Sequence, residues 1–290
     1  MSPAAGLGVH LEKKQKTEGS GGKGAPDQQD PKSKPKKKLY RARAHSNPLN
    51  DQSFDVPTTP DGIDWSEHFP CLASDGAGAG KEAEAAGGRV VEFLDVGCGF
   101  GGFLIKLADL YPEKLSLGLE LRDKVSEYVK DRIDVLRENH EAEGLYRNVA
   151  IIRANAMRDL PHYFRKGQLT KVFFLFPDPH FKACNHRRRI ISTPLLDEYA
   201  YFLAKGGILY TITDVEELGK WMRDHLDAHP LFRRISNEDL EGDKAAQFLP
   251  SASEEAQKVK RNEGKVRHSF VRPAGLSSLA AVTCDLCVAC

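Results

Sequence analysis

The sequence predicts an α/β fold in which a mostly parallel, twisted sheet carries helices on both faces. Two observations support this prediction. From Val90 onward, short apolar runs alternate with longer runs of helical periodicity, which is typical of a parallel sheet. The stretch VVEFLDVGCGFGG (90–102) is one such junction, where an apolar strand leads through Gly97, Gly99 and Gly102 into a helix. Glycines in this turn permit positive φ angles and let a ligand approach the backbone amides.

Each element is expected from its own run of residues. Strands are expected over 90–96, 115–120, 149–154, 172–176 and 208–213, where apolar and β-branched residues are concentrated. Helices are expected over 102–110, 123–139, 194–203 and 215–228, where apolar residues recur with helical spacing. A final strand pair is expected between 232–236 and 269–272. Sheets of this class bind ligands at the carboxyl ends of their strands, so that edge is the expected site.

Length and composition indicate one large domain with a tail at each end. The 290 residues are 40% hydrophobic, and 42 Lys and Arg balance 41 Asp and Glu, so the net charge points to no class of partner. No apolar run reaches the roughly 18 residues of a membrane span, and no secretory signal is visible, so we expect an intracellular protein. We assign 1–38 to a disordered tail, 39–273 to the domain with a flexible insertion at 74–88, and 274–290 to a second tail.

The tails carry an uneven distribution of charge and thiols. Segment 32–43 contains seven Lys or Arg and no acid, and Lys34 to Lys38 is interpreted as a nuclear import signal or a phosphate-contacting arm. The six cysteines do not form the spaced framework of a secreted disulfide protein, which favours a reducing compartment. Cys284, Cys287 and Cys290 have metal-like spacing without a fourth ligand nearby, so we expect no metal site there.

The ends of the second and third expected strands carry candidate binding residues. Glu120 closes the run LSLGLE, where a carboxylate can accept hydrogen bonds from two ribose hydroxyl groups. The glycine turn and Glu120 fit either a dinucleotide or S-adenosylmethionine. The carboxylates of Glu92 and Asp95 favour the cationic S-adenosylmethionine over a diphosphate. Asn155 and Ala156, after the third strand, are candidates for contacts with the adenine ring.

The stretch FFLFPDPHF (173–181) places one carboxylate at the end of a buried strand. Because Pro177 and Pro179 fix the backbone on both sides of Asp178, its carboxylate is expected to point rigidly into the strand-end crevice. A basic cluster at 185–189 follows, and the mixed aromatic and basic segment 40–48 can cross the mouth of the same site. Positive charge at these places favours a nucleic-acid substrate. The residues expected to contact it are Arg41, Arg43, His45, His180, Lys182, Arg187 and Arg188.

Beyond these single sites, an ordered series of stretches closely resembles one family. The series is RAHSNP, DVGCGFGG, GLELRDKVSEYV, NAM, KGQLTKVFFLFPDPHFK, RRRIIS, GGILYTITD, HPLF and RNEGK. It is similar to the catalytic subunit of eukaryotic tRNA (guanine-N7-)-methyltransferase over roughly Tyr40 to Arg272. PDPHFK together with GLELR is specific for that family, whereas the glycine turn alone is not.

The resemblance implies a Rossmann-like class I methyltransferase fold. It also implies methyl transfer from S-adenosylmethionine to N7 of guanosine 46, in the variable loop of tRNA, and a noncatalytic WD-repeat propeller as partner subunit. The active-site aspartate of the family falls on Asp178. Its cofactor contacts fall on Gly97, Glu120, Arg122, Asn155, Ala156, Leu175, Ser253 and Glu255. Ser253 replaces a threonine of the family pattern and keeps the hydroxyl group.

Three alternatives to this function stay open at the level of sequence. A noncatalytic RNA-binding scaffold with the same fold accounts for the basic segments equally well. N7 methylation of other RNAs uses the same chemistry. A dinucleotide oxidoreductase uses the same glycine turn, but the sequence offers no acid-base pair for hydride transfer. The intact glycine turn, Glu120 and Asp178 favour the enzyme over the scaffold.

Overall fold

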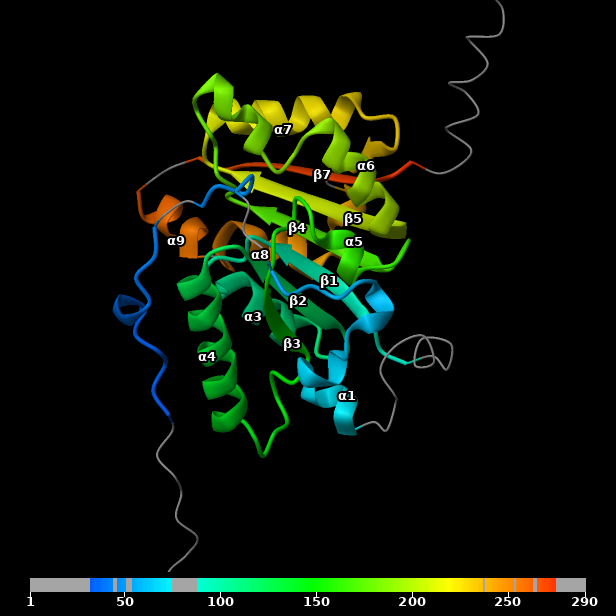
Figure 1. Cartoon of the computed structure of the whole chain (residues 1–290). Coiled ribbons are helices and arrows are strands. Elements are labelled where there is room, and N and C mark those ends of the chain that lie inside the picture. The colour runs from blue at the N-terminus through cyan, green and yellow to red at the C-terminus, as the bar shows by residue number, and fades with distance from the viewer. Residues whose placement is uncertain are drawn as a thin grey trace, which may run out of the picture. The chain divides into compact units, whose positions relative to one another are not determined.

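The computed structural model in Figure 1 describes residues 32–43, 46–50, 54–74, 88–236, 238–252, 254–262 and 265–274. Within these ranges, seven strands form one sheet in the order β3-β2-β1-β4-β5-β7-β6. Strands β1 to β5 pair in parallel with their neighbours, and β7 pairs antiparallel with β5 and β6. The strands are β1 Val91–Val96, β2 Leu115–Glu120, β3 Val149–Arg153, β4 Leu169–Leu175, β5 Leu203–Thr213, β6 Phe232–Arg234 and β7 Arg267–Pro273. The expected mostly parallel sheet and the expected final strand pair are confirmed, and that pair is antiparallel.

Helices cover both faces of this sheet (Figure 1). One face carries α3 Gly102–Leu110, α4 Asp123–Asn139 and α8 Lys244–Ala252, with α9 Glu254–Arg261 following α8. The other carries α1 Pro70–Ser74, α5 Leu160–Tyr163, α6 Thr193–Phe202 and α7 Glu216–Ala228. The 3-10 turns are η1 Lys37–Leu39, η2 Pro60–Gly62, η3 Trp65–Glu67, η4 Ala183–Arg188 and η5 Glu238–Leu240. No helix among the described residues combines the length and the apolar character that crossing a bilayer requires.

The two cores follow from the alternation of side chains along the strands. Leu94 of β1 points to the core beneath α5, α6 and α7, whereas its neighbour Phe93 points to the core beneath α3 and α8. On the second face, the ring of Phe173 stacks on Tyr210 with centroids 4.5 Å apart and meets Phe103 edge-on at 4.8 Å. All five of these side chains are buried, so both sides of the sheet are covered.

Where the hydrophobic periodicity is strong, the expected bounds of an element agree with the structure to the residue. Where it is weak, the bounds differ or the element was not expected. Strand β2 and helices α3 and α4 have the expected bounds, while β5 begins at Leu203 rather than at 208. Helices α8 and α9 were not expected. Pro250 in the last turn of α8 interrupts the helical signal, and α9 buries little more than Ala256 and Val259. The expected insertion at 74–88 lies, apart from its two end residues, outside the described residues.

The segment before the sheet runs along α4 (Figure 1). The ammonium group of Lys32 lies 2.7 Å from the Glu138 carboxylate, and its backbone N–H donates to Asn139. Nearer the helix start, the hydroxyl of Tyr40 donates to Asp131. Among the described residues, contacts with the domain thus already occur at Lys32, inside the segment that composition assigned to the N-terminal tail.

A largely buried ion pair, with side chains 16% and 8% exposed, fixes the start of α8 to the centre of the sheet. The ammonium of Lys171 on β4 lies 2.5 Å from the carboxylate of Asp243, and the hydroxyl of Tyr210 also donates to it. The same carboxylate accepts the backbone N–H of Ala245 at 2.9 Å and so caps the helix. Burial by itself raises the pKa of Asp243, but the hydrogen bonds from Lys171 and Tyr210 hold the pKa below its usual 3.8.

We expect Asp243→Asn to lower the free energy of unfolding at pH 7 by about 3–5 kcal/mol, because Lys171 keeps a buried charge without its counter-charge. The carboxylate has a lowered pKa in the folded state, so its contribution is present above pH 3.8 and is lost as the pH falls through the folded-state pKa. Urea titrations should show the gap to wild type narrowing in acid. Asp224→Asn is the matched control, since Asp224 pairs with Lys220 at the same 2.5 Å on the surface and should leave stability almost unchanged. Equal losses in both variants would contradict this account.

Candidate active site

The glycine turn after β1 forms an open cradle at the carboxyl edge of the sheet. Gly97, Gly99 and Gly101 have φ angles of 69°, 54° and 74°, in the left-handed region that side chains disfavour. The backbone N–H groups of Gly97 and Cys98 donate to the carbonyl of Leu119 at 2.8 and 3.1 Å, which ties the turn to the end of β2. A Cβ built at Gly97 or Gly99 meets no atom within 4 Å, so this side of the turn is free for a ligand.

Glu120 lies beside this turn as a buried carboxylate. It is 4% exposed at the end of β2. Its Oε1 accepts from the backbone N–H of Arg122 at 2.9 Å and from Nε at 3.1 Å, and its Oε2 accepts from the guanidinium at 2.9 Å. The carboxylate is therefore held in one orientation by the residue that begins α4.

Three carboxylates act on the guanidinium of Arg122. Burial lowers the pKa of Arg122, but the hydrogen bond and charge of Glu120, together with the charges of Asp178 and Glu255, raise the pKa overall. Those carboxylates come from the end of β2, the loop after β4 and the first turn of α9. The structure thus brings Glu120, Arg122, Asp178 and Glu255 near one another. Their roles at the cofactor and the substrate stay predictions. Ser253, expected beside Glu255, lies outside the described residues.

Asn155 and Ala156 are buried where β3 ends. The side-chain amide of Asn155 donates to the carbonyl of Pro48 at 2.6 Å and accepts the N–H of Met157 at 3.0 Å. The contact with Pro48 brings segment 46–50 to the carboxyl edge of the sheet, where the sequence predicted it. The contact of Asn155 with adenine stays a prediction.

The loop after β4 carries Asp178 in a strained backbone. β4 ends at Leu175, also expected at the cofactor, and the following Phe176 has a φ of 51°. His180 has a φ of 45°, so two residues other than glycine in the left-handed region enclose the Pro-Asp-Pro sequence. The N–H of Phe176 donates to the carbonyl of Ile212 on β5 at 2.8 Å. The half-buried Asp178 is thereby held at the strand end.

The residues expected to contact nucleic acid differ in exposure. Arg41, Arg43, Lys182 and Arg187 are exposed, and His180 and Arg188 are half-buried. His45 lies outside the described residues. The basic cluster 185–189 does not act as one exposed patch, because Arg189 is only 1% exposed. The sequence placed that arginine with its exposed neighbours, and the apolar Ile190 and Ile191 after it were the one signal of its burial.

One other sequence interpretation needs correction. Glu92 does not offer its charge to a cofactor, because it forms an ion pair with Lys114 at 2.8 Å at the opposite edge of the sheet.

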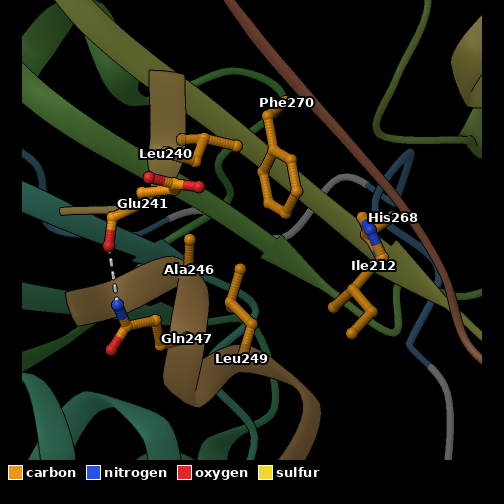
Figure 2. Close-up of a pocket in the computed structure, with 8 residues that line it drawn as sticks. All are labelled: Ile212, Leu240, Glu241, Ala246, Gln247, Leu249, His268 and Phe270. Carbon is orange, nitrogen blue, oxygen red and sulfur yellow. Dashed lines mark hydrogen bonds between the residues drawn. The ribbon is translucent and has the colours of Figure 1, made fainter. Parts of the chain in front are cut away.

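A separate apolar pocket lies between α8 and strands β5 and β7 (Figure 2). Its wall is closed on one side by a hydrogen bond from the Gln247 amide to the carbonyl of Glu241 at 2.9 Å. The lining residues are Ile212, Leu240, Glu241, Ala246, Gln247, Leu249, His268 and Phe270. None of them is a residue that the sequence assigned to the site.

The residues at the carboxyl edge fit S-adenosylmethionine. The open side of Gly97 and Gly99 admits a ligand against the backbone, and the buried carboxylate of Glu120 matches a ribose diol. Asp95, which is 1% exposed, lies near the end of β1, two residues before Gly97. The carboxylates of Glu120 and Asp178 lie at this edge with the single guanidinium of Arg122. This set of charges suits a cationic ligand better than a phosphate.

Two alanine variants separate the cradle from the packing behind it. Both Gly97→Ala and Gly101→Ala force a left-handed alanine, at about 1–2 kcal/mol each. At Gly101 the new Cβ also lies 2.8 Å from Cγ1 of Val129, so we expect a further loss of about 1–3 kcal/mol in stability. At Gly97 the new methyl group lies in open space, so we expect the Kd for S-adenosylmethionine to rise about tenfold or more. Calorimetry of both variants checks this, and unchanged affinity in folded Gly97→Ala would refute the cradle.

Comparison with known proteins shows the family of the chain. The model of a family described as putative methyltransferase matches residues 89–269. A tRNA (guanine-N(7)-)-methyltransferase of Arabidopsis thaliana is 55% identical over 238 residues, covering 82% of this chain and 91% of that protein. Proteins of the same description from Oryza sativa subsp. japonica and Caenorhabditis briggsae are 53% and 50% identical, covering 83% and 80% of this chain and 92% and 85% of theirs. The chain belongs to the tRNA (guanine-N(7)-)-methyltransferase family.

Proposed function

We propose that Asp178 holds guanosine 46 of tRNA while its N7 receives the methyl group of S-adenosylmethionine. As a member of its family, the chain is an S-adenosylmethionine-dependent methyltransferase that acts on guanine N7 of tRNA. The observation that supports the role of Asp178 is its place. It lies at the end of β4 between two prolines, and its charge acts on Arg122, the partner of Glu120.

The chemistry of guanine N7 determines what the protein has to supply. N7 carries an in-plane lone pair and no proton, so its methylation needs no general base at that atom. When bound, S-adenosylmethionine supplies an electrophilic methyl group on a positively charged sulfur. The residues of the site hold N7 in line with that methyl group, and such alignment lowers a barrier by as much as about 7–11 kcal/mol.

The carboxylate of Asp178 suits the selection of guanine. Guanine presents N1–H and the exocyclic amine on one edge, and a carboxylate can accept both hydrogen bonds. The guanine ring gains positive charge as the methyl group arrives, so a fixed negative charge stabilises the transition state more than the ground state. Adenine offers no N1–H and is therefore rejected.

Exposed basic residues on two sides of Asp178 are proposed to bind the phosphates of tRNA. Lys182 and Arg187 belong to the segment after the Pro-Asp-Pro loop, and Arg41 and Arg43 precede the segment that touches Asn155. All four side chains are exposed, and each phosphate contact adds affinity that salt screens. His45, His180 and Arg188 complete the proposed substrate-binding set.

We further propose that the chain acts as the catalytic subunit beside a noncatalytic WD-repeat propeller. The support is the family resemblance of the stretches from RAHSNP to RNEGK. The exposed lysines of segment 34–38 likewise support a proposal that the protein is imported into the nucleus.

Methyl transfer from labelled S-adenosylmethionine to total tRNA, with and without a coexpressed WD-repeat subunit, tests the function. We expect label at a variable-loop guanosine, read by chain cleavage at N7-methylguanosine, and more of it with the partner. Asp178→Ala should lose nearly all transfer and keep cofactor affinity, and Asp178→Asn should be intermediate because it keeps an acceptor without the charge. Near-normal turnover of Asp178→Ala would reject the role of this residue. RNA binding without any label, even with the partner, would instead identify a scaffold.

Nuclear import is tested with a fluorescent fusion. Replacing Lys36, Lys37 and Lys38 by alanine should move the fusion from the nucleus to the cytoplasm, whereas arginine at the same positions should keep it nuclear because the charge is retained. A wild-type fusion that is excluded from the nucleus, or an alanine variant that stays there, contradicts the proposal.

A further inference from the structure

The largest fully buried side chain among the described residues is charged. Arg189 is 1% exposed, although it stands in a run of three arginines whose first member, Arg187, is exposed. A buried guanidinium requires hydrogen bonds and a counter-charge to offset its desolvation. Its contacts therefore show what the protein uses it for.

Arg189 joins the loop that carries Asp178 to helix α7. Its Nε donates to the backbone carbonyl of Pro179 at 2.9 Å. Its terminal nitrogen donates to Oε1 of Glu217 at 2.6 Å, in the first turn of α7. The guanidinium also lies over the ring of Trp221, 4.6 Å from the centroid. One side chain thus spans from the residue after Asp178 to a rigid helix.

The helix side of this contact is itself fixed. The indole N–H of Trp221 donates to the carbonyl of Ile191 at 2.8 Å, which returns the helix to the segment that carries Arg189. Hydrogen bonding from Arg189, together with the charges of Arg189 and His186, lowers the pKa of Glu217. The carboxylate is therefore ionised at neutral pH and supplies the counter-charge.

The loop requires such a hold because its backbone is strained. Phe176 and His180 both lie in the left-handed region, and such residues persist only where the surroundings fix them. At the first end of the loop, the N–H of Phe176 is bound to Ile212 at 2.8 Å. At the second end, Pro179 has no backbone N–H, so only its carbonyl can form a backbone hydrogen bond. That carbonyl accepts the hydrogen bond from Arg189.

We propose that Arg189 is a positioning residue that sets the place of the Asp178 carboxylate through its hydrogen bond to Pro179. The proposal rests on the role of Asp178 given above. Lysine cannot replace it, because one ammonium group lacks the planar fork that donates in two fixed directions while covering an aromatic ring. Arg189 touches neither substrate in this role and acts only through the loop.

The test compares steady-state kinetics of Arg189→Met with the neighbouring control Arg187→Met, using the full chain and the same tRNA assay. We expect Arg189→Met to lose about 100-fold in kcat, as a small misplacement of a catalytic group does, with the Kd for S-adenosylmethionine within about twofold. Arg189→Lys should recover only part of kcat. Arg187→Met should instead raise KM for tRNA at nearly constant kcat. Unchanged kcat in Arg189→Met, or a parallel loss of cofactor affinity, would overturn the proposal.

A double substitution shows whether Arg189 acts through Asp178. In an Asp178→Asn background, Arg189→Met should cost little further activity, because the group that it positions is already impaired. A full additional loss would mean that Arg189 acts elsewhere and would overturn the proposal. If Arg189→Met does not fold, its exposed partner is changed instead, as Glu217→Gln. We expect this variant to have a lower kcat with unchanged affinity for S-adenosylmethionine. An unchanged kcat would refute the proposal. Absence of transfer by the wild-type chain would reject the function itself, which keeps the two failures distinct.

Discussion

The site depends on the hydrogen bonds by which Gly97 and Cys98 donate to the carbonyl of Leu119. These bonds join the turn after β1 to the last residues of β2, so the open glycine backbone and the Glu120 carboxylate meet at a fixed separation. Parallel pairing of β1 with β4 then places the Pro-Asp-Pro loop on the other side of the same turn. A parallel sheet makes this possible because all its strands end at one edge.

The charged residues near the site have different roles, which depend on how exposed each side chain is. The half-buried Arg122 binds the carboxylate of Glu120. The buried Arg189 binds the carboxylate of Glu217, the carbonyl of Pro179 and the ring of Trp221. The exposed cations Arg187 and Lys182 lie in the same stretch of chain as Arg189 and face solvent, where we propose that they bind tRNA phosphates. Arg187 and Arg189 are only two residues apart but differ in burial and in contacts. The composition of the segment does not distinguish them.

The parts of the fold that sequence predicted well are those with a local cause. Helices α3 and α4 have their expected bounds because apolar residues repeat with helical spacing, and β2 because a continuous apolar run ends at a carboxylate. Glu120 and Asp178 could be placed at strand ends from the sequence because the first closes an apolar run and the second follows one. The burial of Arg189 and the pairing of Glu92 with Lys114 could not be predicted, since their partners are 28 and 22 residues away and only the folded chain brings them together.

The pairing of Lys171 with Asp243 also specifies how the strands of the sheet align. Lys171 lies opposite Phe93 on β1 and Ile208 on β5, and its ammonium reaches α8 on one face only. A slip of β4 by one residue turns every side chain to the other face, and it would leave Asp243 buried without a counter-charge beneath the helix that it caps. The apolar residues Val172, Phe173 and Phe174, which follow Lys171 on β4, tolerate either face far better than an ion does. The ion pair of Lys171 with Asp243 thus disfavours a shift of β4 by one residue against β1 and β5. Such a shift would also move Asp178, in the loop after β4, relative to the glycine turn after β1.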